Sequence, residues 1–435
     1  MLKLFIKTFG CQMNVYDSAR MRDALLVQGY QETQDVAKAD VILVNTCHIR
    51  EKASEKLFSE LGRFAREKKK GALVVVTGCV VQADGAEILR RSQLIDIAVG
   101  PQNYHELPQL IAKYNRSKGR VLKADFPAES KFDSLPAPQK SAAAAFLAIQ
   151  EGCDHFCSYC VVPYTRGCEY SRPMKEIVKE AKALVKLGAK EIMLLGQNVN
   201  GWHGDKGKDL GDLIRELARI RGLKRLRYTT SYPSEMTQNL INAHRDTPKL
   251  MPYIHLPIQS GSDKVLKAMN RQYTAKEYER VVAAFRKARP DIAISSDFIV
   301  GFPGETEEDF EETLHLVERV KYASSYSFKF SARPGTPASL MKNQIPEEVK
   351  TKRLMKLQAL LLKQQKAFNE ATVGKEFDVL LTEKGKAKGQ LLGYSPYMQG
   401  TVVKAPAKML GEIVKVKITG ASATALKGEI VKEKR

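Results

Sequence analysis

The sequence predicts an α/β protein in three parts: a parallel α/β domain, a partial (β/α) barrel and a small C-terminal β-barrel. Two successive series of short apolar runs alternate with helical patterns, which is typical of parallel sheets covered by helices. The last 65 residues instead hold short strands separated by glycines, a spacing typical of a small antiparallel barrel. At 435 residues the chain is long enough for about three domains.

The N-terminal part, residues 1–115, carries the first alternating series. Its apolar runs are β-branched and continuous, as expected for strands that are buried on both faces of a sheet. The predicted strands are Leu2–Thr8, Val41–Asn45 and Leu73–Thr77, and the predicted helices are Ser18–Gln28, Glu51–Lys69 and Gly85–Ser92. Residues 116–140 are rich in Ser, Lys, Pro and Ala, so we expect a linker there.

The central part, residues 141–370, carries the second series. Six strands alternating with helices exceed what a small open sheet needs and favour a full or partial barrel, whose ligand site lies at the carboxyl ends of its strands. The predicted strands are Ala145–Gln150, Glu191–Gly196, Arg225–Thr230, Tyr253–Gln259, Ile292–Val300 and Tyr326–Ser331. A helix over Glu307–Val320 and a long helix over Pro346–Glu370 are also expected.

The C-terminal part, residues 371–435, is predicted to form the small β-barrel. It holds 12 Lys and Arg against 6 Asp and Glu, a local excess of +6 that suits a nucleic-acid-binding module. A folded appendage without a binding role is the alternative. The predicted strands are Phe377–Leu381, Gln390–Tyr394, Gly400–Val403, Glu412–Ile418 and Lys427–Val431.

The charge and hydropathy of the whole chain narrow the class of protein. Lys and Arg number 70 against 49 Asp and Glu, and the net charge of +21 favours a polyanionic partner, with a solvated Lys-rich surface as the alternative. No apolar run approaches the ~20 residues of a membrane-spanning helix, and the N-terminus lacks a secretory signal pattern. We therefore expect a cytoplasmic protein with no membrane association, in which the seven cysteines stay reduced.

The strongest motif is a C-x3-C-x2-C loop directly after the first strand of the central part. Its three thiolates, Cys153, Cys157 and Cys160, can hold three irons of a 4Fe–4S cluster and leave the fourth iron open to a chelating substrate. A zinc site completed by His155 is the alternative. Zinc sites usually combine two ligand pairs, and no second cysteine pair follows at a suitable distance, so the pattern favours iron.

Three further cysteines, Cys11, Cys47 and Cys79, follow the first, second and third predicted strands of the N-terminal part. The carboxyl ends of parallel strands lie at one edge of a sheet, where loops converge on a ligand. Any one of these residues alone is more often a buried small hydrophobe. Their shared position predicts a second three-cysteine site, whereas Cys168 has no such place.

These motifs resemble the methylthiotransferase family of radical S-adenosylmethionine (SAM) enzymes, and the resemblance extends over nearly the whole chain. It implies a methylthiotransferase N-terminal domain, a radical SAM barrel and a C-terminal TRAM-like RNA-binding barrel. The segments that carry it are FGCQMN (9–14), NTCHIREKASEK (45–56), GCDHFCSYCVVPYTRG (152–167), LLGQNVNGW (194–202), HLPIQSGSDKVLKAMNRQYT (255–274) and GFPGET (301–306).

Within the family, GCQMN and CVVPYTRG most resemble the branch that modifies isopentenyl(dimethylallyl)adenosine. That branch adds a methylthio group to carbon 2 of this adenosine at position 37, next to the anticodon of tRNA. Other branches act on threonylcarbamoyl-adenosine in tRNA or on an aspartate of a ribosomal protein, and they carry different residues after the first cysteine. From another class, a non-catalytic RNA-binding protein with structural metal is the alternative.

The resemblance implies two 4Fe–4S clusters and SAM as cofactors, and it makes all six cluster cysteines the expected catalytic residues. An adenine ring C–H bond has no useful acidity at neutral pH, so acid–base groups cannot replace its hydrogen with sulfur and a radical must do so. The loop cysteines would hold the cluster that cleaves SAM to a 5′-deoxyadenosyl radical. The strand-end cysteines would hold the cluster that presents the sulfur. Tyr159 matches the aromatic residue that packs on the adenine of SAM.

Polar residues at the ends of central strands are further candidates for holding SAM. Side chains at strand ends face the ligand site of a (β/α) barrel, and a glycine there lets the backbone approach the ligand closely. The same residue types are equally common in turns and helix caps, which is the alternative. The candidates are Gln197, Asn198, Gln259, Ser260, Asp297, Gly301 and Glu305.

The expected RNA contacts lie in the C-terminal part. Lys384–Lys388 and Lys404–Lys408 suit a diffuse phosphate-binding surface, whereas Tyr394 and Tyr397 suit either stacking on unpaired bases or the barrel core. We expect removal of this part after about Ala371 to weaken tRNA binding but to leave SAM cleavage largely unaltered.

The remaining partners follow from the resemblance. They are the anticodon stem-loop of tRNA, an electron donor such as flavodoxin or ferredoxin, and a sulfur source, and the protein is expected to be a monomer. Arg166, Arg172 and Arg333 flank the predicted mouth of the barrel and are candidates for phosphate or the SAM carboxylate, with a solvated surface position as the alternative.

Overall fold

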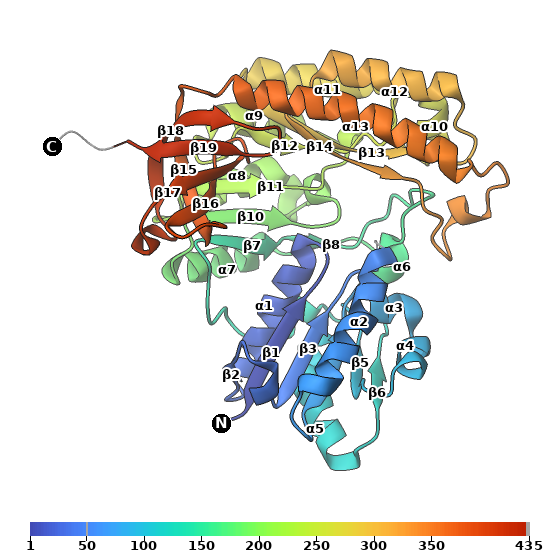
Figure 1. Cartoon of the computed structure of the whole chain (residues 1–435), viewed down its shortest axis with the longest axis vertical. Helices are drawn as coiled ribbons and strands as arrows, with labels where there is room; N and C mark the ends of the chain where they lie inside the picture. The colour runs from blue at the N-terminus through green and yellow to red at the C-terminus, as the bar shows by residue number, and fades with distance from the viewer. Residues whose placement is uncertain (49–50, 432–435) are drawn as a thin grey trace. The chain divides into compact units, whose positions relative to one another are not determined.

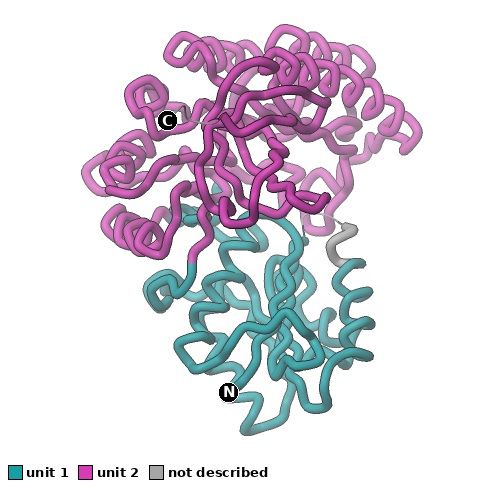
Figure 2. Tube along the Cα trace, turned by 60° about the vertical axis from the view of Figure 1, so that its left-hand side comes forward, with its two compact units in different colours: residues 1–140, 146–154, 161–170 teal, residues 141–145, 155–160, 171–435 magenta. Residues whose placement is uncertain are grey.

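The computed structural model describes residues 1–48 and 51–431, which form two compact units (Figure 2). Unit 1 comprises residues 1–140, 146–154 and 161–170. Unit 2 comprises residues 141–145, 155–160 and the chain from Ser171 onward. Within the described ranges, no helix is both long enough and apolar enough to cross a membrane.

Unit 1 is built on a six-stranded parallel sheet with the strand order β2-β1-β3-β4-β5-β6 (Figure 1). The strands are β1 (Lys3–Thr8), β2 (Gln31–Glu32), β3 (Val41–Asn45), β4 (Leu73–Thr77), β5 (Ile97–Val99) and β6 (Val121–Lys123). The helices are α1 (Gln12–Leu26), α2 (Glu51–Glu67), α3 (Cys79–Asp84), α4 (Ala86–Arg91), α5 (Leu107–Ser117) and α6 (Val162–Arg166). Short 3-10 helices are η1 (Val36–Lys38), η2 (Tyr104–Glu106) and η3 (Lys131–Ser134).

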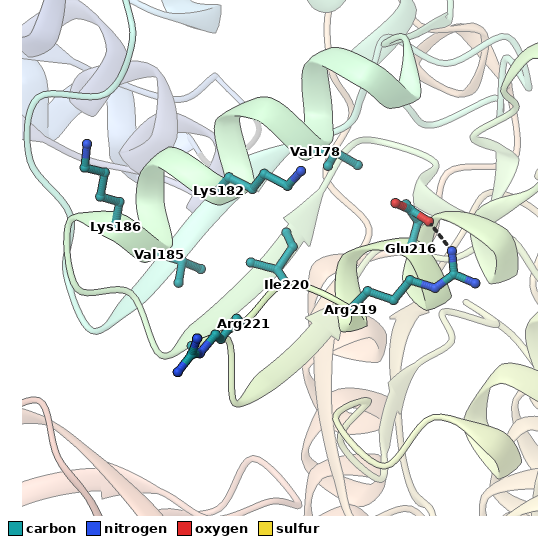
Figure 3. A pocket seen from close by; sticks show the side chains of 9 residues that line it. Val178, Lys182, Val185, Lys186, Glu216, Arg219, Ile220 and Arg221 are labelled. Atoms are coloured by element: carbon teal, nitrogen blue, oxygen red, sulfur yellow. Dashed lines mark hydrogen bonds and ion pairs between the residues drawn. The ribbon is translucent and has the colours of Figure 1, made fainter.

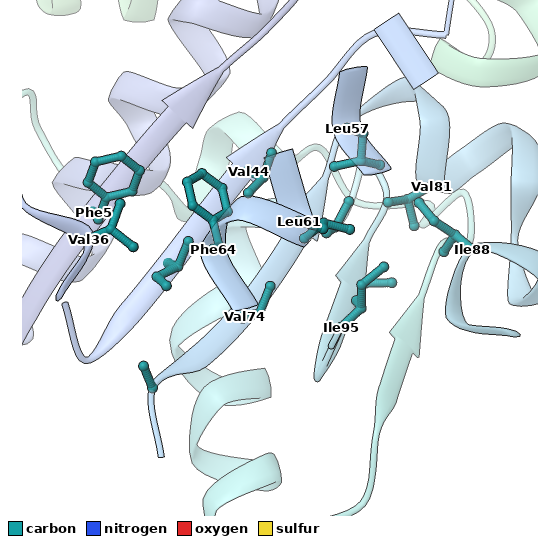
Figure 4. Close-up of a cluster of buried hydrophobic side chains, with 14 of the residues drawn as sticks. Phe5, Val36, Val44, Leu57, Leu61, Phe64, Val74, Val81, Ile88 and Ile95 are labelled. Carbon is teal, nitrogen blue, oxygen red and sulfur yellow. The ribbon is translucent and has the colours of Figure 1, made fainter. Parts of the chain in front are cut away.

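Helices cover both faces of this sheet, as the continuous apolar runs predict. One face packs against α2 through Leu57, Leu61 and Phe64 (Figure 4). The other face packs against α1 and α5, which contribute Leu25 and Leu110 among others. Because alternate residues of each strand point to opposite faces, both clusters draw on the same strands, and the whole of β3 is buried.

Helix α1 begins six residues earlier than the predicted Ser18–Gln28. The sequence pattern hides this first turn because polar residues of the helix are buried rather than exposed, among them Asn14, Asp17 and Ser18. An amphipathic pattern assumes that polar side chains face water. Here they face the carboxyl end of the sheet, where the candidate site lies.

Residues 116–140 differ from the expected linker. They supply β6, which pairs with β5 at the edge of the sheet, and η3, in which Lys131 is only 1% exposed. The segment is Ser- and Pro-rich in sequence, yet three residues of β6 and one buried cation tie it into unit 1. Short strands and a buried lysine are features that composition alone cannot reveal.

Three short strands lie where the chain passes between the two units: β7 (Ala144–Ala148), β8 (Gln150–Glu151) and β9 (Tyr170–Ser171). In unit 2, β10 (Glu191–Leu195) pairs in parallel with β11 (Arg225–Tyr228). Backbone N–H groups of Lys190 and Glu191 donate to Ala143 O, so the segment leading into β7 lies beside the start of β10.

The other strands of the central part form a parallel sheet of order β12-β13-β14. They are β12 (Tyr253–His255), β13 (Ala293–Val300) and β14 (Ser324–Lys329). A parallel bridge between Leu226 and Leu250 links β11 to the segment before β12, so the strands follow one another as in a partial (β/α) barrel. The helices are α7 (Met174–Lys186), α8 (Leu210–Ala218), α9 (Gln238–Asp246), α10 (Asp263–Ala268), α11 (Ala275–Ala288), α12 (Glu307–Val320) and α13 (Glu347–Glu370).

The C-terminal strands close into a five-stranded barrel of order β15-β16-β17-β19-β18. They are β15 (Glu376–Lys384), β16 (Gln390–Tyr394), β17 (Gly400–Lys404), β18 (Ile413–Ala421) and β19 (Leu426–Ile430). Val379, Leu391, Val403 and Val416 fill its interior. The predicted fold class is thereby confirmed, including the partial central barrel and the small terminal one.

Candidate metal centres

The strand-end cysteines of unit 1 lie at one edge of its sheet. β1, β3 and β4 are neighbours, and their last residues, Thr8, Asn45 and Thr77, are in register. Each strand is followed within three residues by a cysteine. From β1 the chain continues outward to β2, whereas from β3 it continues in the opposite direction to β4 and β5. The strand order therefore reverses between β1 and β3, and α/β sheets bind ligands at the carboxyl ends of the strands at such a topological switch point.

Cys11 is exposed, whereas Cys47 and Cys79 are each 3% exposed. A hydrogen bond with Cys47 lowers the pKa of Cys11 to about 6. Burial raises the pKa of Cys79. The arrangement brings the three predicted ligands into one electrostatically linked group.

Polar side chains of α1 form hydrogen bonds with Cys11 and with the end of β3, next to the strand-end cysteines. The Cys11 thiol donates to Asn14 Oδ1 at 3.0 Å, and Asn14 Nδ2 donates to Asn45 Oδ1 at 2.8 Å. Asn45 Nδ2 in turn donates to Ser18 Oγ at 3.0 Å. These contacts explain the buried polar residues of α1: they orient the cysteine loops rather than pack a core.

Gly10 is required by the same geometry. Its φ of +118° lies in a region that side chains disfavour, and a Cβ atom there would lie 2.5 Å from Cys47 Cβ. The FGC segment thus lets the first and second cysteine loops approach closely.

Of the second cysteine motif, Cys153 belongs to unit 1, whereas Cys157 and Cys160 belong to unit 2. In unit 1, Cys153 N–H donates to Gly167 O at 3.3 Å, and a side chain at Gly152 would collide with Cys168 O. Cys168 itself is exposed. In unit 2, Cys160 N–H donates to Cys157 O at 2.9 Å and closes a turn that brings these two cysteines together.

The segment Ala268–Tyr273 holds the unit 2 side of this loop. Ser158 donates through its N–H to Met269 O at 3.0 Å and through its hydroxyl to Ala268 O at 2.8 Å. Arg271 Nη1 lies 3.5 Å from Cys157 Sγ, and its guanidinium stacks on Tyr232, 4.3 Å from the ring centre. A buried cation therefore stands beside a predicted cluster ligand, and the sequence analysis did not single it out.

The donor sets consist of cysteine thiols, the residues that hold iron–sulfur clusters. Among the side chains of residues 1–48 and 55–431, no three His, Cys, Asp or Glu have the spacing needed for one metal ion. Cubane ligands each bind a different iron, so they need not converge on one point. His155, the fourth ligand of a zinc alternative, instead stacks on Tyr232 at 3.6 Å and lies 3.1 Å from Glu235 Oε1.

Asn198 contacts both His155 and Glu235. Asn198 Nδ2 donates to Glu235 Oε2 at 2.7 Å. Burial opposes ionisation of Glu235, but the hydrogen bonds from His155 and Asn198 outweigh it and hold the pKa of Glu235 below its usual range. Glu235 was not singled out from the sequence, and it offers a charged oxygen beside the cysteine loop.

The other residues that are predicted to contact SAM differ in backbone conformation and in burial. Gln259 has a φ of +78° and exchanges backbone hydrogen bonds with Asp297 and Ile299, a strained arrangement of the kind found at ligand sites. Ser260 contacts Thr313 at 3.3 Å, whereas Gln197 and Tyr159 are half-buried. Tyr159 packs against the apolar cluster around Met269 and Phe302.

Gly301 and Glu305 are joined by a hydrogen bond within the same turn. The Gly301 N–H donates to Glu305 Oε2 at 2.6 Å, and Arg353 of α13 pairs with the same carboxylate at 2.8 Å. Glu305 is 3% exposed, so its carboxylate is committed to the loop and to α13. In this structure the Glu305 carboxylate positions the Gly301 turn, and its expected contact with SAM stays a prediction.

Strand β14, at the edge of the β12-β13-β14 sheet of unit 2, carries large exposed aromatic side chains. On β14, Tyr326 is 58% exposed and Phe328 is 39% exposed, and by register they share a face with Asp297 and Ile299. His255 lies on the same face, between Ser295 at 3.0 Å and Asp297 at 3.3 Å. Strands of parallel α/β sheets are normally covered on both faces, so this exposure marks an uncovered surface beside polar side chains.

Two of the three arginines that are predicted at the mouth of the barrel are buried and paired with carboxylates. Arg166 is 3% exposed and pairs with Asp17 and Glu151 in unit 1, and Arg172 pairs with Glu180 at 2.7 Å. Both lie too deep for the predicted phosphate contact. Arg333 is half-buried.

The C-terminal barrel is anchored on the central part of unit 2. Arg227 donates to Ser395 O and Pro396 O, each at 2.8 Å, and Arg225 donates to Tyr394 O at 3.0 Å. Both arginines are buried and share Glu191 as their counter-ion. Hydrogen bonds from these two buried arginines thus join the C-terminal barrel to β11 of the central part.

Tyr397 is part of the same anchor. Its ring packs at 5.4 Å from that of Phe377, and its hydroxyl donates to Asp291 at 2.9 Å. Of the two alternatives for Tyr397, the packed position holds, whereas Tyr394 remains half-exposed.

A cavity of about 590 Å³ lies apart from all these residues, at the carboxyl ends of α7 and α8 (Figure 3). Lys182, Lys186 and Arg221 line it around an apolar floor that includes Val185 and Ile220. It contains none of the predicted ligands of a cluster or of SAM.

Family comparisons agree with this three-part architecture. Residues 3–100 match the uncharacterized protein family UPF0004, residues 147–317 match the radical SAM superfamily, and residues 370–431 match the TRAM domain. A tRNA-2-methylthio-N(6)-dimethylallyladenosine synthase from Maricaulis maris (strain MCS10) is 53% identical over 447 residues, covering 100% of this chain and 98% of the relative.

Solved structures share the fold at low sequence identity. The radical SAM methyltransferase TsrM from Kitasatospora setae has a TM-score of 0.59 at 15% identity, over 78% of this chain and 75% of that chain. The cobalamin-dependent SAM radical enzyme OxsB has a TM-score of 0.55 at 12% identity, over 83% of this chain and 56% of that chain. At these identities the likeness concerns the fold alone.

Proposed function

The chain belongs to the family of tRNA-2-methylthio-N(6)-dimethylallyladenosine synthases and is a radical SAM methylthiotransferase. We propose that it methylthiolates carbon 2 of isopentenyl(dimethylallyl)adenosine next to the anticodon of tRNA. The observation that carries this proposal is the pairing of two three-cysteine motifs with full-length identity to a synthase of that name.

The radical SAM family implies SAM and a 4Fe–4S cluster, and we assign that cluster to Cys153, Cys157 and Cys160. We propose a second 4Fe–4S cluster on Cys11, Cys47 and Cys79, supported by their common position at the switch point of the sheet. When bound, these groups supply the radical chemistry and the sulfur site that no side chain provides.

The residues of this chain position those groups and exclude water. Ser158 ties the cysteine loop of unit 2 to Ala268 and Met269, and Arg271 places a buried positive charge beside Cys157. Glu235 and Asn198 offer polar atoms next to that loop, where the amino group of SAM needs acceptors.

We assign the substrate base to the exposed face of β14. Adenine has an aromatic face and the isopentenyl group is apolar, and Tyr326 and Phe328 offer stacking and apolar contact. Burial of the five-carbon group contributes a few kcal/mol, at ~0.8 kcal/mol per CH2-sized unit. This contribution gives preference for the prenylated adenosine.

We propose that the protein works in the cytoplasm as a monomer, with a one-electron donor such as flavodoxin or ferredoxin and a separate sulfur source. Selectivity for tRNA is supported by the TRAM domain and the net charge of +21.

The proposal is tested by mass spectrometry of tRNA nucleosides from a strain that lacks the gene. We expect the methylthiolated nucleoside to disappear, its isopentenyl precursor to accumulate, and the wild-type gene to restore the product. Unchanged methylthiolated adenosine together with a lost modification of a ribosomal protein would move the chain to that branch of the family.

A further inference from the structure

Four buried charges form one group in unit 1 beside the strand-end cysteines. Arg166 at the end of α6 lies between Asp17 of α1 and Glu151 of β8, and Lys131 of η3 pairs with Glu151 from the other side. None of the four is more than 3% exposed. We call these four residues the buried charge group.

Arg166 is held in one orientation by its two carboxylate partners. Nη1 donates to Glu151 Oε1 at 2.7 Å and Nη2 donates to Asp17 Oδ2 at 2.8 Å. The guanidinium is planar, so these two bonds also fix the direction of its third nitrogen. That nitrogen, Nε, donates to Cys79 Sγ at 3.3 Å.

The group balances two positive charges with two negative ones. Burying ion pairs has a desolvation cost that well-packed apolar residues would avoid, so stability alone is a weak reason to retain four charges here. Lys131 serves as an internal comparison, because Lys131 Nζ contacts Glu151 at 2.6 Å and lies 3.8 Å from Asp17. Only Arg166 of the two cations has a hydrogen bond to the cysteine sulfur.

We propose that Arg166 is a positioning residue for the N-terminal three-cysteine centre, which it serves by donating a hydrogen bond to Cys79 Sγ and by bringing a buried positive charge next to that sulfur. This inference rests on the second cluster of the proposed function. Asp17 and Glu151 hold Arg166 in place, and Lys131 neutralises the negative charge that remains.

The consequence is a property of the cluster rather than of the fold. Hydrogen bonds to cluster sulfurs, nearby net charge and burial set the reduction potential of iron–sulfur centres. Reduction adds negative charge, which a donor and a cation at Cys79 stabilise. Arg166 therefore raises the reduction potential of the N-terminal cluster.

The test uses the full chain with Cys153, Cys157 and Cys160 replaced by Ala, so that one expected cluster remains. Two double variants are made in this background, D17N/R166Q and D17N/K131Q. Each removes one buried cation and the same carboxylate, so the two have equal net charge. They differ in whether the donor to Cys79 is retained.

Iron and sulfide content and the midpoint potential from an EPR-monitored titration are measured after reconstitution. We expect D17N/R166Q to shift to a more negative potential than the parent, and D17N/K131Q to stay close to the parent. The single variant R166K, which keeps the charge but loses the planar fork, should fall between them.

Equal potentials in the two double variants would overturn the role of Arg166 while leaving the second cluster in place. Absence of any cluster in the parent would overturn the second cluster and this inference with it. If D17N/R166Q fails to fold, the R166K protein decides: a potential equal to that of the parent contradicts the proposal.

Discussion

At the scale of single residues, chemistry depends on side chains whose partners lie far away in the sequence. The six cysteines that we propose as cluster ligands stand out by their spacing and by their place after strands. Arg166, Glu235 and Arg271 are not, because their roles come from contacts that only the fold creates, such as Arg166 with Asp17 across 149 positions. Arg166 was assigned to the mouth on its position after the cysteine loop, and the structure buries it instead.

The first prediction concerns the radical SAM cysteines. Replacing Cys153, Cys157 and Cys160 by Ala should remove half of the iron and abolish reductive cleavage of SAM, because each thiolate is an expected ligand. Iron analysis and 5′-deoxyadenosine formation are the measurements. Cys168→Ser is the matched control, since Cys168 is exposed and should change neither quantity. Deoxyadenosine formation at the wild-type rate in the triple variant would refute the assignment.

The second prediction concerns the exposed aromatic face of β14. Tyr326→Ser should weaken productive binding of tRNA by roughly 5- to 150-fold in kcat/KM, because stacking on one base contributes about 1–3 kcal/mol. SAM cleavage without tRNA should be little changed. Tyr253→Phe removes only a hydroxyl from β12, which β13 separates from β14, and serves as the control. An unchanged kcat/KM for Tyr326→Ser would show that the base binds elsewhere.

At the scale of helices and strands, the long buried strands are the most predictable elements. β3 and β4 match their predicted bounds because fully buried strands form continuous β-branched runs. The start of α1 and the short strands β5 and β6 could not be predicted, since buried polar residues break the helical pattern and three-residue strands leave no periodicity. In unit 2, β12 ends at His255, four residues short of the prediction, because Pro257 has no N–H to donate and the Ile258 N–H donates to Ser296 Oγ instead of to a backbone oxygen.

The third prediction concerns removal of the C-terminal barrel, which from the sequence alone is expected to leave SAM cleavage largely unaltered. Truncation after Ala371 would strip Arg225 and Arg227 of their backbone acceptors on β16 and the turn that follows it. Hydrogen bonds that involve a charged group contribute about 1.5–3 kcal/mol each, so the loss of these acceptors lowers the stability of the central part. We expect the truncated protein to melt at a lower temperature and to lose part of its SAM cleavage activity. Calorimetry and deoxyadenosine formation are the measurements.

A matched variant separates loss of the anchor from loss of RNA binding. Tyr397→Phe removes only the hydroxyl bond to Asp291 and should lower the melting temperature slightly. If the truncated protein melted like the full chain, the anchor would contribute nothing and the barrel would be an independent appendage.

At the scale of the whole molecule, charge and domain content point to an RNA substrate. The three-part organisation could be predicted because each part has its own pattern of strands and glycines. Composition set residues 116–140 apart as a linker, but the buried residues Val121 and Lys131 and the pairing of β6 with β5 tie this segment to the first part.

The fourth prediction concerns salt. If Lys and Arg side chains neutralise tRNA phosphates, affinity should fall by about 0.7–0.9 log units per tenfold rise in salt for each phosphate contacted. Replacing Lys384, Lys386 and Lys388 by Gln should reduce that slope. Filter binding at several salt concentrations measures it, with Lys264→Gln as a control because Lys264 pairs with Asp309. A slope near zero would contradict a phosphate-binding surface.

The central claim is methylthiolation of isopentenyl(dimethylallyl)adenosine, and turnover of defined tRNA tests it most directly. Reconstituted full-length protein is given SAM, reductant, sulfide and tRNA with or without the isopentenyl group, and methylthiolated nucleoside is quantified. The account predicts efficient product formation from the prenylated tRNA and little from the unmodified one. Equal turnover of both tRNAs, or turnover of neither, would contradict it.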